Sequence, residues 1–504
     1  MRSKQAFKNV ISSIALQLII VITGIYIPQL MITTYGSEIN GMVSSITQFI
    51  TYLSLVEAGI GNASIVALYG PLATKNQDGI NGVLAAAKKF YSKSGCIFTI
   101  LLLGLAIIFP MISEKGIDPA LSRWMVLVLG SSVLIDFFFL GKYRVLLTAD
   151  QKGYIFYLVQ SIGTILNSLT CILLMYIKAD ILIVKLSATI VYILRSVFIF
   201  LYAKHHYDYL NFNVKPNALA LKQRWDVLIH QITGAVVNST DAVIITVVIK
   251  KFAEVSVYTT YNLIISNIIS LIESFSNSLC AGFGEVFAKN EKEIIKQSYS
   301  TYEYIYYIVI FIVCSCLGVL IIPFMKIYTY GINDANYIRP ITAILFVLIT
   351  IGKGIRTPSM TMILAVGHYR ETKKAAIFEA LINITVSLGL VNFLGINGLL
   401  IGTLCSHIYR TIDVILYNDK KIVHDTKEKT LKRIIRNIIC MFVILSIGIY
   451  INSHIMPHTW ISWLIYAVAV GIGSLIVILG INGIMEKDEI IELGKLSKRI
   501  ITRR

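Results

Sequence analysis

Charged residues are scarce in this chain. They make up 14% of its 504 residues, whereas hydrophobic residues make up 56%. A soluble domain typically carries about 25% charged residues. The mean hydropathy is +0.74. This balance excludes a soluble enzyme or a soluble binding domain, and it predicts an integral membrane protein.

Cysteine and the motifs of common catalytic sites are few or missing. The seven cysteines lie within apolar runs with no CxxC or Cys/His spacing, so we expect buried thiols rather than disulfides or a metal site. The chain has no phosphate-binding GxxxxGKS/T loop, no HExxH and no GxSxG. We therefore expect no catalytic residue, no metal and no resident cofactor, and predict that the protein is not an enzyme.

Acidic residues are outnumbered by basic ones, 28 to 45, for a net charge of +17. If the N-terminus is cytoplasmic, 33 of the 45 basic residues lie on the cytoplasmic side and 8 on the other. The positive-inside rule then favours cytoplasmic N- and C-termini. We expect the basic runs at 419–421, 427–433 and 495–504 to contact anionic membrane lipids, with no role in nucleic-acid binding.

Long apolar runs predict the architecture. Windows of about 20 apolar residues, bounded by charged or turn residues, indicate an all-α polytopic membrane protein with about fourteen transmembrane helices. The expected spans are 10–34, 41–69, 91–113, 121–148, 154–177, 181–203, 226–249, 256–287, 302–328, 339–366, 374–394, 397–417, 434–455 and 460–484.

The two halves of the chain repeat each other. We predict two pseudo-symmetric six-helix lobes, 1–212 and 213–417, followed by two additional helices and a basic cytoplasmic tail in 418–504. Lobes related in this way, with a central cleft, suit alternating access. Four pairs of matching positions lie 214 to 216 residues apart: Glu57 and Glu273, Leu103 and Leu317, Asn167 and Asn383, and Arg195 and Arg410.

Two cations lie near the middle of the predicted span 339–366. Lys353 and Arg356 stand three residues apart in GKGIRTP, with no acidic residue nearby in the sequence. Each costs about 2.5–3.5 kcal/mol at a helix centre. The glycines and Pro358 predict a locally broken helix, which is tolerated where it borders a cavity. We expect an anion-binding site here; the alternative is an ion pair with Asp136, Glu57 or Glu273.

Four carboxylates within predicted spans are candidates for ion coupling or for lining the cleft: Glu57, Glu273, Asp136 and Asp241. A lone carboxyl at membrane depth can change its protonation as the cleft opens, which would couple transport to H⁺; Asp241 can also coordinate Na⁺. Duplicated structural scaffolding remains an alternative for Glu57 and Glu273. The fourth span carries Asp136 without a cation near its middle, which favours an anionic or amphiphilic cargo.

Two arginines occupy matching positions in the sixth and twelfth spans. Arg410 has Asp413 three residues on, so local pairing or snorkelling explains both Arg195 and Arg410. In the alternative, each helps to steer a phosphate group at the inner mouth of the cleft.

The stretch YGSEINGMVSSITQFITYLSLVEAGIG at 35–61, the two six-helix lobes and the two trailing helices resemble the Wzx-type polysaccharide flippases. That superfamily also holds the lipid II flippase and the multidrug extruders. The resemblance implies a cationic cavity that accepts an undecaprenyl-diphosphate-linked oligosaccharide, with Lys353 and Arg356 holding the diphosphate. Span 10–34 contains no basic residue, which argues against lipid II as the cargo.

The same resemblance implies a place in the bacterial cytoplasmic membrane and a role in capsule, O-antigen or exopolysaccharide synthesis. A polysaccharide polymerase and a chain-length regulator would be partners. Two other functions stay open. One is an ion-coupled multidrug antiporter of the same fold. The other is a membrane glycosyltransferase or polymerase, against which the short outside connections argue.

Overall fold

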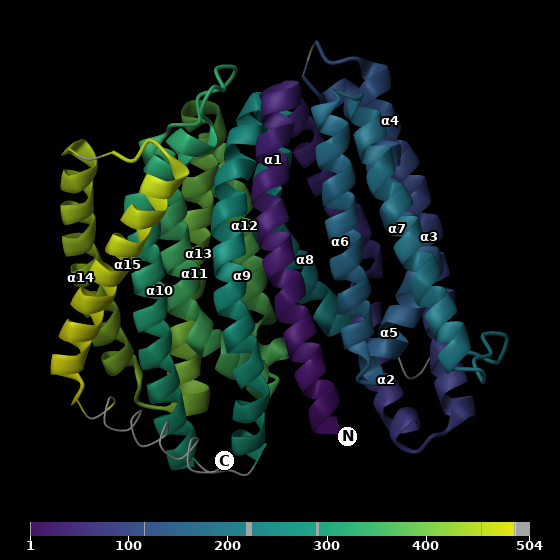
Figure 1. Cartoon of the computed structure of the whole chain (residues 1–504). Coiled ribbons are helices and arrows are strands. Elements are labelled where there is room, and N and C mark those ends of the chain that lie inside the picture. The colour runs from purple at the N-terminus through teal and green to yellow at the C-terminus, as the bar shows by residue number, and fades with distance from the viewer. Residues whose placement is uncertain are drawn as a thin grey trace. The chain divides into compact units, whose positions relative to one another are not determined.

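The computed structural model describes residues 2–114, 116–217, 224–288, 292–454, 456–487 and 489, and these contain helices and no strand (Figure 1). The prediction of an all-α polytopic membrane protein is confirmed. The helices are α1 (Arg2–Ser54), α2 (Ile60–Ala73), α3 (Gln77–Ile112), α4 (Pro119–Ile135), α5 (Gly141–Ala149), α6 (Gly153–Tyr176), α7 (Ile181–His206), α8 (Arg224–Ile244), α9 (Phe252–Ala288), α10 (Lys292–Tyr328), α11 (Pro340–Val366), α12 (Tyr369–Leu394), α13 (Ile396–Asn418), α14 (Lys427–His454) and α15 (Trp460–Met485).

Thirteen helical segments among the described residues are long and apolar enough to cross a membrane. The first, at Ile11–Ala73, covers both of the predicted spans 10–34 and 41–69. Gly36 interrupts it with a left-handed, non-helical backbone (φ 86°, ψ 167°), a conformation that glycine adopts without steric penalty. The fourteen predicted spans and the thirteen segments therefore describe the same helices.

The chain divides into two compact units, Met1–Leu263 and Ile264–Arg504. In the first unit, α1 packs on α6, α6 on α7, and α3 on α4. In the second, α13 packs on α11 and α12, and α10 packs on α11, α14 and α15. The lobe boundaries at 212 and 417 that the duplication suggests stay a prediction, as do the cytoplasmic termini. The tail from 490 to 504 lies outside the described residues.

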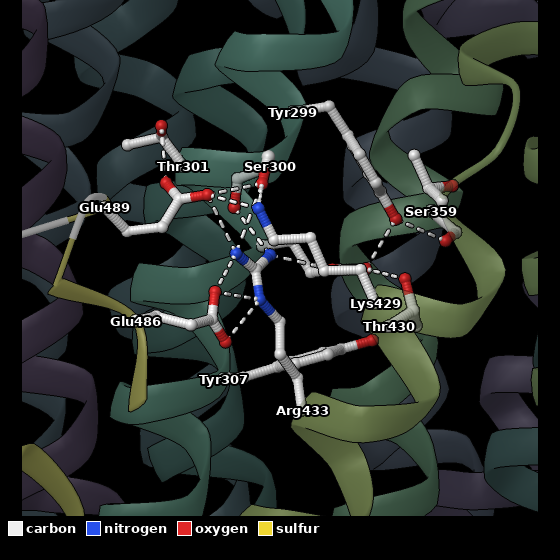
Figure 2. Close-up of polar contacts among 12 residues, drawn as sticks. Tyr299, Ser300, Thr301, Tyr307, Ser359, Lys429, Thr430, Arg433, Glu486 and Glu489 are labelled. Carbon is white, nitrogen blue, oxygen red and sulfur yellow. Dashed lines mark hydrogen bonds and ion pairs between the residues drawn. The ribbon is translucent and has the colours of Figure 1, made fainter. Parts of the chain in front are cut away.

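A buried group of ions fixes the two trailing helices to the second unit (Figure 2). Arg433 of α14 is 1% exposed. Its guanidinium lies 3.0 Å from Glu303 of α10, 2.6 Å from Glu486 and 3.0 Å from Glu489. Because a buried charge is tolerated only when it is paired, these contacts tie α14 to α10 and to the end of α15.

Two further cations complete this C-terminal ion network. Lys429 lies 2.7 Å from Glu489, and Arg436 lies 2.6 Å from Glu486. Burial acts to raise the pKa of Glu486, but hydrogen bonds and charge from Arg433 and Arg436 hold that pKa below its usual range. Burial likewise acts against ionisation of Glu489, yet its bonds to Lys429 and Ser300 and the charge of Arg433 keep its pKa low. Three cations and three carboxylates thus neutralise one another.

We expect Arg433→Ala to destabilise the protein by about 3–5 kcal/mol, because it leaves three buried carboxylates with only two cations. Thermal unfolding of the purified protein in detergent measures the change. Lys429→Met is the matched control: Lys429 is 49% exposed, so its loss should cost about 1 kcal/mol or less. Equal, small effects of the two substitutions would show that the network does not hold the trailing helices.

Candidate functional site

The helix that carries Lys353 and Arg356 is continuous. α11 runs from Pro340 to Val366 with Pro358 inside it, so the predicted local break is wrong. Gly354 instead allows close packing, since a Cβ at this position would overlap Ile310 of α10. The Thr411 and Tyr307 hydroxyls donate to the carbonyls of residues 352 and 355, 3.0 Å in each case, and support the helix near Pro358.

Lys353 is not an unpaired cation. Its Nζ lies 3.0 Å from Oε1 of Glu273 on α9, and the side chains are 25% and 35% exposed. The expectation that no carboxylate neutralises Lys353 is therefore wrong, and so is the expectation that Glu273 is a lone carboxyl. The alternative ion pair with Glu273 is confirmed. Eighty residues separate the two in the sequence, so only the packing of α9 and α11 reveals the contact.

Arg356 is paired as well, with a carboxylate that sequence reasoning missed. Its guanidinium donates to Oε1 of Glu379 on α12. The same carboxylate lies 3.4 Å from Nδ1 of His407 and 3.6 Å from Nε of Arg410, both on α13. Arg410 also donates to Asp413 at 2.8 Å, so its predicted local pairing is confirmed. The available signal was that Glu379 is the single acidic residue of the span 374–394.

These contacts form a neutral group in the second unit, which we call the α11 ion cluster. It contains three cations and three carboxylates: Lys353, Arg356, Arg410, Glu273, Glu379 and Asp413. Glu379 and Arg410 are deeply buried, whereas Lys353 and Glu273 are partly exposed. The buried members hold the helices together, and the Lys353–Glu273 pair is the part that a ligand can reach.

The first unit contains a second polar site. Arg144 of α5 lies 3.1 Å from Glu57 and 3.1 Å from Asp136. Glu57 is therefore not a lone carboxyl either, and Asp136 does have a basic partner. The prediction missed Arg144 because it lies close to the end of the predicted span 121–148. Arg144 serves two carboxylates at once, so this site carries one more carboxylate than cations.

Irregular backbone surrounds this site. Glu57 ends a one-turn 3₁₀ segment (Leu55–Glu57), and Gly59 follows with a left-handed backbone (φ 84°). Asp136 begins a π-helical segment (Asp136–Leu140). Such segments recur at functional sites, and within a membrane they require a cavity or protein packing beside them. A cavity of about 500 Å³ lies here, lined by Glu57, Arg144, Asn62, Thr148, Gln231 and neighbouring residues.

The remaining predicted residues lie apart from these two groups. Asp241 of α8 is buried and accepts a hydrogen bond from Tyr258 at 3.0 Å. Arg195 of α7 has its guanidinium carbon 4.0 Å from the centre of the Tyr192 ring. No carboxylate of the described residues lies within ion-pair distance of Arg195, so local pairing with an acid does not explain it. Within the described part of the chain, no group of three or more His, Cys, Asp or Glu residues is placed to hold a metal ion.

We expect Glu379→Gln to destabilise the protein by about 3–5 kcal/mol, because Arg356 and Arg410 lose a buried countercharge. Adding Arg356→Met should recover part of the loss, since one uncompensated cation is removed with its partner. Thermal unfolding of both single variants and the double variant measures this coupling. Strictly additive losses would contradict a direct interaction between the two side chains.

Solved structures share this fold. The lipid II flippase MurJ in an inward closed conformation matches with a TM-score of 0.72 and 18% identity, over 95% of this chain and all of that chain. An inward-facing multidrug resistance MATE transporter of the MOP superfamily matches at 0.67 and 16% identity, over 83% of this chain and 99% of its own. A MOP superfamily transporter from Pyrococcus furiosus Vc1 (DSM3638) matches at 0.54 and 16% identity, over 82% of this chain and 95% of its own.

No protein-family model and no curated relative matches the sequence. The chain is a multi-pass membrane protein with the fold of MOP-superfamily transporters and flippases.

Proposed function

We propose that this protein is a flippase that moves an undecaprenyl-diphosphate-linked oligosaccharide across the bacterial cytoplasmic membrane by alternating access. The cargo would serve capsule, O-antigen or exopolysaccharide synthesis, with a polymerase and a chain-length regulator as partners. The protein would act as a transporter rather than as an enzyme.

The observation that carries this proposal is the partly exposed Lys353–Glu273 pair at the middle of α11. Apolar residues of similar size often stabilise a protein as well as a buried ion pair does, so stability alone does not require charges there. A carboxylate on a neighbouring helix can act as a replaceable counter-ion. When a diphosphate arrives, it can take the place of Glu273 beside Lys353, and the cation stays compensated throughout.

The coverage of the structural neighbours also favours a flippase. The lipid II flippase aligns over 95% of this chain, whereas the MATE transporter aligns over 83% although nearly its whole length is used. The alternative is an ion-coupled multidrug antiporter. The carboxylate-rich cavity around Glu57 would suit cationic drugs, whereas the Lys353 site suits an anion.

We expect the double substitution Lys353→Ala and Arg356→Ala to abolish surface polysaccharide and to make lipid-linked repeat units accumulate in the inner leaflet, at normal protein level. Lys353→Ala alone should lower export by about thirtyfold or more, as expected when a cation is removed from a buried charged contact. Polysaccharide immunoblots and mass spectrometry of lipid-linked intermediates measure both quantities.

Glu273→Gln is the matched control, because it breaks the same ion pair and leaves the cation in place. It should retain export, since Lys353 remains available to the cargo. If Lys353→Ala and Glu273→Gln impair export equally, the pair has a structural role and the proposed anion site is wrong.

We further propose that the cavity in the first unit couples transport to H⁺ or Na⁺. Arg144 neutralises only one of the two carboxylates beside it, and Oδ1 of Asp136 is buried without a hydrogen-bond partner. An excess carboxylate in a polar cavity can take up a proton or a monovalent cation. The buried Asp241 of α8 is a second candidate for the same role.

We expect the double variant Glu57→Gln and Asp136→Asn to bind cargo normally but to lose the acceleration of flipping that an imposed gradient gives. Flipping in proteoliposomes under a pH gradient or a Na⁺ gradient measures this. Glu38→Gln changes an exposed carboxylate on α1 and is the control. Flipping by the double variant that still follows the gradient would remove Glu57 and Asp136 from the coupling mechanism.

A further inference from the structure

Two helical hairpins, α6–α7 and α12–α13, occupy repeat-related places in the two units. Their connecting contacts correspond residue by residue. The Cys171 thiol donates to the carbonyl of Val184 (4.0 Å), and the Ser387 hydroxyl donates to the carbonyl of Leu399 (3.3 Å). Donors and acceptors are 216 and 215 residues apart, which are the offsets of the sequence repeat. The two hairpins can therefore be compared position by position.

The first difference between the hairpins concerns the conserved arginine of the repeat. In α12–α13, Arg410 lies 3.6 Å from the carboxylate of Glu379 and 2.8 Å from that of Asp413. The corresponding residues in α6–α7 are Gly163 and Phe198. Arg195 has thus lost both of the acidic partners that its counterpart possesses.

The second difference lies beside the first. Asn383 donates to the Thr403 hydroxyl at 2.9 Å, whereas the residue that faces Asn167 in the other hairpin is Ala188. Two side chains that fill the α12–α13 hairpin are therefore missing between α6 and α7. A cavity of about 80 Å³ occupies the space, lined by Gly163, Thr164, Asn167, Ala188, Tyr192 and Arg195.

Arg195 lies near the middle of α7, where an unpaired cation is costly. The Tyr192 ring covers one face of its guanidinium, but Nε of Arg195 is buried without a hydrogen-bond partner. Both acidic residues of the nearby cavity, Glu57 and Asp136, are bonded to Arg144 instead. The property first expected of Lys353, a cation within the membrane without a carboxylate, belongs among the described residues to Arg195.

We propose that Arg195 and Asn167 form a subsite for a single oxyanion, a phosphate or carboxylate group carried by an amphiphile. Guanidinium and carboxamide groups together supply several N–H donors for such a group. The carboxylate of Glu379, which approaches Arg410 in the related hairpin, is an intramolecular example of the ligand. A water molecule takes about 30 Å³ of liquid, so the cavity accepts one oxyanion and excludes a sugar ring.

This subsite deepens the proposed function, on which it rests only for the identity of the amphiphile. A lipid-linked phosphate is the source that the proposed cargo supplies. An anionic membrane lipid and free phosphate share the same chemistry. The test must therefore separate a lipid-borne oxyanion from a free one.

The experiment measures binding of phosphatidic acid to the purified full-length protein in detergent by native mass spectrometry, with diacylglycerol of the same chains as the uncharged reference. Arg195→Gln removes the cation, and Gly163→Glu supplies the carboxylate that the related hairpin has. Each should weaken the preference for phosphatidic acid by about tenfold or more. Arg195→Lys keeps the charge but not the planar fork of donors, so it should retain part of the preference.

Gly163→Ala is the matched control for Gly163→Glu. Its Cβ would lie 3.3 Å from Cδ of Arg195, a contact that the flexible side chain can relieve, and it adds no charge. It should bind nearly as the native protein does. Unfolding midpoints without lipid report whether each variant folds; if Gly163→Glu does not fold, Arg195→Gln and Arg195→Lys decide the question.

Native-like binding by Arg195→Gln would overturn the subsite, whatever happens to export. Loss of binding together with unchanged polysaccharide export would support the subsite and remove it from the path of the proposed cargo. Competition by inorganic phosphate would assign the site to the free anion, and insensitivity to it would assign the site to a lipid-borne group. Both of these outcomes support oxyanion recognition by Arg195.

Discussion

The cost of placing a charge inside a membrane shapes the polar interior of this protein. Each ion removed from water must be compensated by a partner on another helix, because no solvent is at hand to do so. Arg433 meets three carboxylates, Glu379 meets two arginines and a histidine, and Arg144 is shared between two acids. The same contacts that remove this cost decide which helices stay together and where a charged ligand can enter.

The two units solve this problem differently within a common frame. The second unit brings its own carboxylate, Glu379, to the arginine of the repeat, whereas the first unit has a glycine at that position and a small cavity. The carboxylates Glu57 and Glu273 keep corresponding positions, yet one is paired with an arginine shared with Asp136 and the other with a single lysine. A duplicated scaffold with unequal charges fits a transporter whose cargo has a charged end and a neutral end.

Much of the fold was predictable, because hydropathy is a local property of the sequence. Apolar runs located the helices, and the constant offset between Glu57 and Glu273 or between Arg195 and Arg410 revealed the repeat. Ion-pair partners were not predictable in this way. Glu273 reaches Lys353 across eighty residues, and Glu379 reaches Arg356 from the next helix. The glycines of GKGIRTP were interpreted as helix breakers, whereas Gly354 serves close packing against Ile310.

The order in which the C-terminal ion network is synthesised has a consequence for biogenesis. Ribosomes make Glu303 first and Arg433 next, and Glu486 and Glu489 only after a further fifty residues or so. Newly inserted α14 must therefore reside in the bilayer with its guanidinium served by one acid, until α15 emerges and delivers the other two. Translation pauses or premature stop codons within α15 would strand that intermediate, so the last helix completes the electrostatic closure of a segment already inserted.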